Sequence, residues 1–167
     1  MKKLILAALI ALFLIINSFG IQAQNQKPKL NQIELMKQWI GSWKNESGKD
    51  STFIYDFKPF NKAYEVYYEV NVKGIKASTA KKLIGYDKKN DAYTEAIILD
   101  DNPELIFTSI RFKSAHTCEI IGSEDLVNPK NAREVRRIEF KSPGSLIWTH
   151  LLNNKVLSAA TFKKIKK

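Results

Sequence analysis

Apolar and polar residues alternate with a period of two along most of the chain after Gly41. The clearest stretch is 64–72, where an apolar side chain stands at every second position. A period of two places successive side chains on opposite faces of a β-strand. The pattern predicts a first strand beginning near Trp43. It predicts further strands over 52–57, 64–72, 78–86, 92–99, 105–113, 117–123, 134–141, 145–152 and 156–165.

Short polar breaks separate these segments, among them 73–74, 142–144 and 153–154. Connections this short join antiparallel neighbours, because a parallel crossover needs a dozen or more residues. The longer break 124–132 is expected to overhang one end. A meander of nine or ten strands has two exposed edges unless its last strand pairs with its first. The sequence therefore predicts an all-β fold, an antiparallel up-and-down meander closed into a barrel.

A different spacing precedes the strands. Between Asn31 and Ile40, apolar residues such as Ile33 and Met36 recur three and four positions apart, which is the spacing of one helix face. Asn31 is suited to cap the helix N-terminus. We expect a short helix here that lies across one end of the sheet.

The N-terminus has the order of a secretory signal peptide. Two lysines precede an uncharged apolar run of 13 residues, 4–16, and Ala23 precedes a polar segment. A membrane-spanning helix needs about 20 apolar residues, although an uncleaved anchor is the alternative. We expect a signal peptide over 1–23, a flexible lead over 24–30 and a single barrel domain over 31–167. The protein is then exported, periplasmic or extracellular, with no lipid anchor, because no cysteine follows the apolar run.

The chain is basic and has one cysteine. Its formal net charge is +10, and removal of the two lysines in 1–23 leaves +8. This charge favours anionic surroundings such as phosphate groups, acidic glycans or membrane headgroups, although scattered lysines also serve simply to keep a surface solvated. Nucleic acid is not an expected partner, because the strand count exceeds that of an OB-fold and the predicted compartment is wrong. Cys118 cannot form an intramolecular disulfide and is expected to be a buried, inert thiol. We expect a monomer.

Two stretches resemble the lipocalin-like, calycin-type barrels, including small exported bacterial domains of unknown function. Residues 33–43 are a predicted helix running into Gly-x-Trp, and 83–87 followed by 92–94 is a strand, a Tyr-Asp turn and a strand. The resemblance implies that Trp43 plugs the closed end of the barrel. In lipocalins an arginine late in the barrel covers this tryptophan. The final strand here has lysines at 163–164 instead, and no residue is carried over to that role.

A barrel of this size is able to hold one small ligand in its mouth. One strand face carries Trp148 and His150, another carries Phe107 and Arg111, and Tyr68 stands on the apolar face of its strand. If these faces point inward, the five residues form a site for an anionic or carboxylate headgroup on an apolar body. If the faces point outward, the same groups lie at the surface in contact with solvent.

The chain contains no nucleophile elbow, no closely spaced carboxylate pair and no metal-ligand cluster in sequence. The leading hypothesis is therefore a non-enzymatic protein that binds a small hydrophobic or amphipathic molecule. No cofactor follows from the residues alone. Three alternatives stay open. The chain is a cationic envelope- or glycan-interaction module, or it binds haem through His150, as its likeness to nitrobindin-like barrels implies. In the third alternative, the chain is an isomerase or hydrolase with Glu95 as the lumen-facing carboxylate.

Overall fold

The computed structural model describes residues 29–47, 50–125 and 128–166. The predicted signal peptide, 1–23, and most of the predicted lead, 24–30, lie outside these ranges, so export stays a prediction. Within them, no helix has the length and apolar character that crossing a bilayer requires.

The described residues form ten strands and four short helical segments. The helical segments are α2 (Gln32–Met36), η1 (Lys37–Trp39), η2 (Ser123–Asp125) and η3 (Pro129–Asn131). The strands are β1 (Gly41–Ser47), β2 (Ser51–Phe60), β3 (Ala63–Val72), β4 (Ile75–Asp87), β5 (Ala92–Leu99), β6 (Ile106–Ser114), β7 (Thr117–Gly122), β8 (Glu134–Ser142), β9 (Ser145–Leu152) and β10 (Lys155–Ile165). Every strand that the alternation predicts is present.

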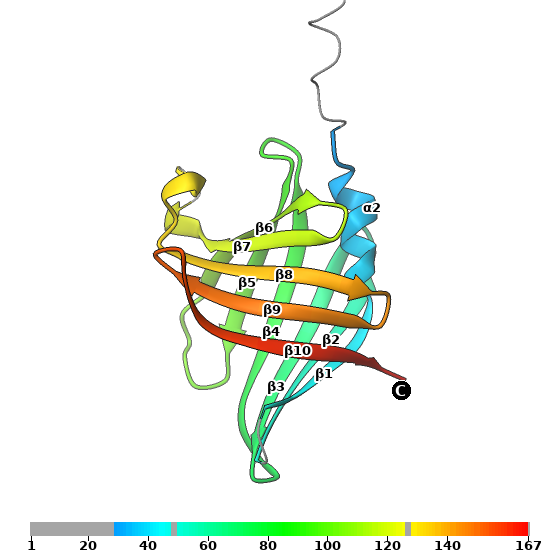
Figure 1. The fold of residues 1–167 in the computed structure, drawn as a ribbon, viewed down its shortest axis with the longest axis vertical. Coiled ribbons are helices and arrows are strands. Elements are labelled where there is room, and N and C mark those ends of the chain that lie inside the picture. The colour runs from blue at the N-terminus through cyan, green and yellow to red at the C-terminus, as the bar shows by residue number, and fades with distance from the viewer. Residues whose placement is uncertain (1–28, 48–49, 126–127, 167) are drawn as a thin grey trace, which may run out of the picture.

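Each strand pairs antiparallel with the next along the chain, and β10 pairs with β1 to close the barrel. The closing pairs are Ser42 with Ile165, Trp43 with Lys164 and Lys44 with Lys163. Strands β7–β10 cross over β2–β5 at a steep angle (Figure 1). The predicted fold class, a closed antiparallel meander with a short N-terminal helix, is confirmed.

Helix α2 covers one end of the barrel (Figure 1). The Asn31 side chain accepts a hydrogen bond from the Glu34 backbone N–H at 3.2 Å, as expected of the N-cap. Gln32 fastens the helix to β6, because its side chain donates to the Phe112 carbonyl at 3.0 Å and accepts from the Phe112 N–H at 2.7 Å. The α-helix is shorter than the predicted 31–40. Its last turn tightens into η1, and the chain is extended at Ile40 before it enters β1.

The closed half of the barrel is packed solid. Trp39 and Trp43 are almost fully buried, and the indole N–H of Trp43 donates to the Trp39 carbonyl at 2.7 Å. Inward-facing residues of most strands meet them there. The cluster comprises Met36, Trp39, Trp43, Phe57, Tyr64, Val66, Ile84, Tyr93, Ile110, Phe112, Cys118, Ile120, Ile138, Phe140, Leu146 and Phe162. The structure therefore places Trp43 in the packed closed end.

The Gly-x-Trp segment is held by a lysine of the last strand. Lys164 Nζ lies 5.1 Å from the centroid of the Trp43 ring, within the range of a cation–π contact. A cation of the last strand thus lies over the buried Trp43 ring. Gly41 has φ = +119°, and a Cβ built there would overlap the end of the Lys164 side chain. The positive φ favours glycine at the start of β1, and the flexible end of Lys164 uses the space that a Cβ would take.

Gly41→Ala is expected to lower the free energy of unfolding by about 1–3 kcal/mol. Alanine at a positive φ is strained, and Lys164 must leave the Trp43 ring to make room. Urea unfolding followed by tryptophan fluorescence measures the loss.

Gly85→Ala is the matched control. Gly85 also lies in a strand, but a Cβ there meets no atom within 4 Å and its φ is ordinary. Its change is expected to stay within about 0.5 kcal/mol. Equal effects of the two substitutions would contradict the role given to Gly41.

Candidate functional site

A cavity of about 400 Å³ opens inside the barrel, beyond the packed half. Its lining comes from β1, β2, β3, β8, β9 and β10. The lining residues are Asn45, Ser51, Phe53, Tyr55, Tyr68, Arg136, Trp148, His150, Ser158, Ala159, Ala160 and Phe162. Grooves of larger volume lie along the outer faces of β3–β5 and beside α2. The inner cavity is the better candidate for a ligand site, because it is concave and mostly apolar with a few convergent polar groups.

A ladder of aromatic rings forms one wall of the cavity. The ring centroids of Trp148 and Tyr55 are 5.1 Å apart, those of Tyr55 and Tyr68 are 4.5 Å apart, and all three rings are nearly parallel. Phe53 continues the ladder, 6.5 Å from Tyr68. Trp148 also meets Trp39 edge-on at 6.0 Å. The ladder therefore stands on the packed core, which fixes its orientation.

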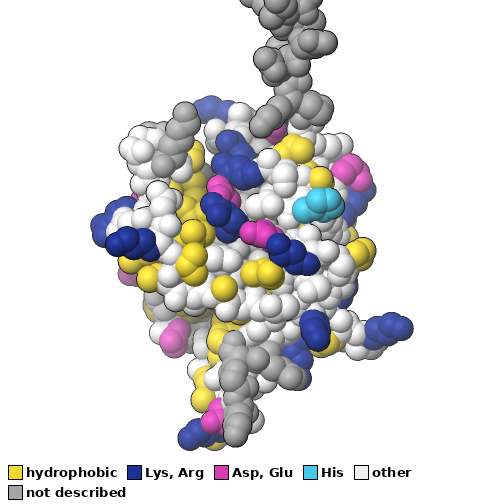
Figure 2. Space-filling view, in the orientation of Figure 1, with side chains coloured by type: hydrophobic (Ala, Val, Ile, Leu, Met, Phe, Trp, Pro, Cys, Tyr) yellow, Lys and Arg dark blue, Asp and Glu magenta, His cyan; other side chains and the backbone are white. Residues whose placement is uncertain are grey.

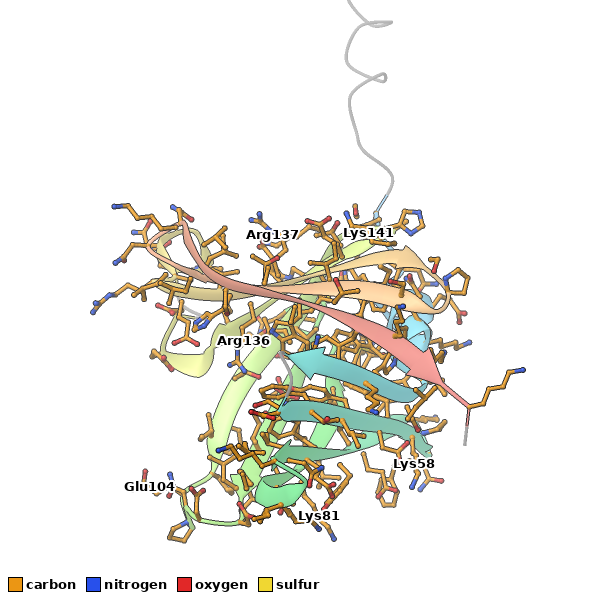
Figure 3. The ribbon with its side chains drawn as sticks, turned by 60° about the horizontal axis from the view of Figure 1, so that its bottom comes forward. Lys58, Lys81, Glu104, Arg136, Arg137 and Lys141 are labelled. Carbon is orange, nitrogen blue, oxygen red and sulfur yellow. The ribbon has the colours of Figure 1, made fainter. Side chains whose placement is uncertain are left out.

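Charged and polar groups line the cavity next to the ladder. Arg136 and His150 are cross-strand partners on β8 and β9. Arg136 Nε lies 4.0 Å from Glu134 Oε1, and His150 Nε2 lies 3.1 Å from the same oxygen. The second distance is that of an ion pair, yet the angles are not those of a hydrogen bond, so Nε2 has no hydrogen-bond partner among the described residues. Figure 3 shows Arg136 and its neighbour Arg137 on opposite sides of β8, with Arg137 on the outside.

The two stacked tyrosines stay protonated at ordinary pH. Burial raises the pKa of Tyr55 well above its usual value, and the nearby Tyr68 and Glu95 raise it further. Burial also raises the pKa of Tyr68, although its hydrogen bond with Tyr55 acts in the opposite direction. Both hydroxyl groups are therefore neutral hydrogen-bonding groups beside the cavity.

An ion pair is buried directly behind this ladder. Lys82 Nζ lies 3.1 Å from Glu95 Oε1, and the two side chains are 7% and 2% exposed. Thr108 Oγ1 donates to the other oxygen of Glu95 at 2.8 Å. Lys82 Nζ also lies 5.5 Å from the ring centroid of Tyr55, which lines the cavity. Buried ion pairs seldom add net stability, because desolvation offsets the attraction.

Three of the five predicted ligand residues come together. Tyr68, Trp148 and His150 all line the inner cavity. Phe107 and Arg111 do not join them: Phe107 is 44% exposed, and Arg111 lines a small outer hollow with Glu119. Strand β6 turns the opposite face inward, with Thr108, Ile110 and Phe112 buried. That face carries more apolar residues than the other face of β6, so the sequence contains a signal for which face points inward.

The structure adds residues that the sequence did not single out. Arg136 takes the place expected of Arg111 as the cavity's guanidinium, and Tyr55 and Phe53 extend the ring wall. From the sequence, Lys82 was predicted only to be part of the strand over 78–86. Glu95 does face the interior and is almost fully buried, but Lys82 and Thr108 engage both of its carboxylate oxygens. It is not poised as a free general base.

His150 Nε2, the atom through which the haem alternative would bind iron, lies 3.1 Å from Glu134 Oε1. Among the described residues, no group of three or more histidine, cysteine or acidic side chains is placed to hold a metal ion.

No protein-family model matches the chain, and no curated protein matches it. The closed ten-strand antiparallel barrel is consistent with a lipocalin-like barrel. The argument for function therefore rests on the cavity.

Lys82→Met is expected to lower the free energy of unfolding by about 3–5 kcal/mol, because it leaves the Glu95 carboxylate buried without its counter-charge. The double substitution K82M/E95Q removes both charges and keeps an acceptor for Thr108. It is expected to recover most of the loss in urea unfolding.

If the double variant loses as much stability as Lys82→Met and Glu95→Gln lose together, Lys82 and Glu95 do not interact as the structure shows. Lys81→Met, in the adjacent outward-facing position, serves as the control and is expected to change stability by less than about 0.5 kcal/mol.

Proposed function

We propose that the protein binds a small amphipathic molecule, an apolar body with an anionic headgroup, in the inner cavity. The observation that carries this proposal is that an aromatic ladder and Arg136 line the same cavity side by side. The rings offer apolar area to the body of the ligand. A guanidinium binds carboxylate or phosphate oxygens through charge-assisted, often bidentate, hydrogen bonds.

The arrangement suits binding rather than catalysis. Arg136 Nε lies 4.0 Å from Glu134 Oε1, beyond hydrogen-bond distance, so this N–H is able to donate to a ligand anion. His150 Nε2 faces the same carboxylate and lacks a hydrogen-bond partner. A ligand oxygen that enters between Arg136 and His150 would accept a hydrogen bond from each. A cavity of about 400 Å³ lies at the small end of ligand sites, which favours a compact molecule.

Two fluorescent probes test the headgroup. Anilinonaphthalene sulfonate has a naphthyl body and an anionic group, whereas N-phenylnaphthylamine has the same body without the charge. Arg136→Met is expected to weaken sulfonate-probe binding roughly tenfold or more, since hydrogen bonds to charged groups contribute about 1.5–3 kcal/mol. Binding of the neutral probe should change little. Fluorescence titration measures both affinities.

Arg137→Met is the matched control, because Arg137 is the next residue on β8 and points outward (Figure 3). It should leave both affinities unchanged. The proposal fails if Arg136→Met and Arg137→Met have the same effect on the sulfonate probe, or if Trp148→Phe and Tyr55→Leu leave both probes bound as before.

A further inference from the structure

An exposed apolar patch lies on the outer face of β4, β5 and β6 and the connection before β6. Its members are Leu83, Ala96, Ile98, Leu105 and Phe107. The register places them together, because Leu83 pairs with Ala96 and Ala96 pairs with Phe107. All except Phe107 line one outer groove of about 600 Å³. The four large side chains are between 44% and 58% exposed, and large apolar side chains grouped in this way mark a contact surface.

The patch is separate from the inner cavity. None of its five members lines that cavity. Phe107 was expected to bind the ligand, but its ring lies on the outer face, beside the groove and outside its wall. The apolar patch therefore needs an occupant of its own.

Two neighbouring cross-strand rows on the outer face connect the patch to charged residues. The first row, from β2 to β6, consists of Lys58, Glu65, Leu83, Ala96 and Phe107. The second row, from β2 to β5, consists of Asp56, Tyr67, Lys81 and Ile98. Both rows contain one cation and one acid before they reach the apolar patch. The face as a whole thus carries equal numbers of both charges beside its apolar part.

This arrangement is complementary to a second copy of itself. A two-fold axis that runs across the strands, between the two rows, sets the first row of each copy over the second row of the other. Glu65 of one copy then lies beside Lys81 of the other, and the apolar patches cover one another. Glu65 and Lys81 are both exposed, and neither makes an ion pair with any of the residues the structure describes, whereas Lys58 is paired with Asp56 at 3.2 Å.

We propose that the protein forms a symmetric dimer through the outer face of β2–β6. A two-fold interface is isologous, so the same surface has to supply both partners of every contact, and this face does so for its apolar side chains and its charges. An anionic surface would meet acids here as often as lysines, and like charges brought together oppose binding. The dimer departs from the monomer expected from the sequence. It does not depend on the proposed function, because the cavity takes no part in it.

The outer face of β7–β10 has a different character. Charged side chains of both signs lie next to one another on it (Figure 2), and they are paired within the chain. Arg137 Nη2 lies 3.0 Å from Glu119 Oε1, and Lys141 pairs with Glu139. Figure 3 shows Arg137 and Lys141 on the side of the barrel away from Lys58 and Lys81. Strand β10 therefore supplies control positions.

Charge reversal tests the contact between Glu65 and Lys81 in the full-length chain. Lys81→Glu and Glu65→Lys each set like charges against one another across the interface, and each should weaken dimerisation roughly tenfold or more. The double variant K81E/E65K should dimerise as the natural chain does. An equimolar mixture of the two single variants should form a heterodimer, because both of its charge contacts then join opposite charges. Sedimentation equilibrium over a range of protein concentrations measures each dissociation constant.

The apolar contribution is measured in the same way. Leu83→Ser and Phe107→Ser should each weaken the dimer roughly tenfold, because each removes a large apolar side chain from the contact. Val156→Ser, at an exposed apolar position on β10, and Lys163→Glu, at an exposed lysine of that strand, should leave the dimer unchanged. Lys81→Met should have only a small effect, since an exposed ion pair contributes little and no like charges are brought together.

Two results would overturn the proposal. The first is a natural chain that stays monomeric throughout the micromolar range. The second is association that persists unchanged in Lys81→Glu and Phe107→Ser, which would mean that another surface, such as the groove beside α2 or the apolar run 4–16, holds the copies together. If a single variant fails to fold, as circular dichroism would show, the double variant still decides the question, because its charges are those of the natural chain exchanged.

Discussion

Strand β10 pairs with strand β1 through Ser42, Trp43 and Lys44, and this pairing turns a meandering ribbon into a body with an inside. An open ten-strand sheet would leave two rows of unpaired backbone groups. Closure satisfies them and commits every second side chain of each strand to the interior. The aromatic ladder, the buried ion pair and the cavity all exist because of that commitment. The cation–π contact between Lys164 and the Trp43 ring adds a side-chain interaction between the same two strands.

The interior is filled unevenly, and the cavity follows from this. Large side chains from α2, η1 and most strands fill the closed half, where Trp39 meets Phe57 and Phe140. Toward the mouth, the inward positions of β10 carry the small residues Ala160 and Ser158, and space is left between β10 and the ring ladder. Arg136 and His150 face this space from β8 and β9. Polar groups are costly in a barrel interior unless water or a ligand reaches them, which is why their placement at the cavity is informative about function.

Much of the fold was predictable because strand alternation is a local property. Residues 64–72 show a period of two without reference to any other strand, and short turns restrict neighbours to antiparallel pairing. The direction in which each face points is a property of the whole barrel. On β6 both faces carry an aromatic ring, Phe107 on one and Phe112 on the other, and only the additional isoleucines of the Phe112 face distinguish the inward one. Of the five predicted residues, Trp148, His150 and Tyr68 line the inner cavity, whereas Phe107 and Arg111 lie on the outer face of β6. Arg136, Lys82 and Lys164 were missed because lysine and arginine are most often solvated, and only tertiary contacts show otherwise.

Closure by β10 is tested most directly by nuclear magnetic resonance of the backbone. The account predicts cross-strand NOEs between the backbone protons of Ser42 and Ile165 and of Lys44 and Lys163, together with slow amide hydrogen exchange along the paired part of β10. If these NOEs are absent and the β10 amides exchange as fast as those of an unprotected edge strand, the barrel is open. The interior described here, with its cavity, then does not exist.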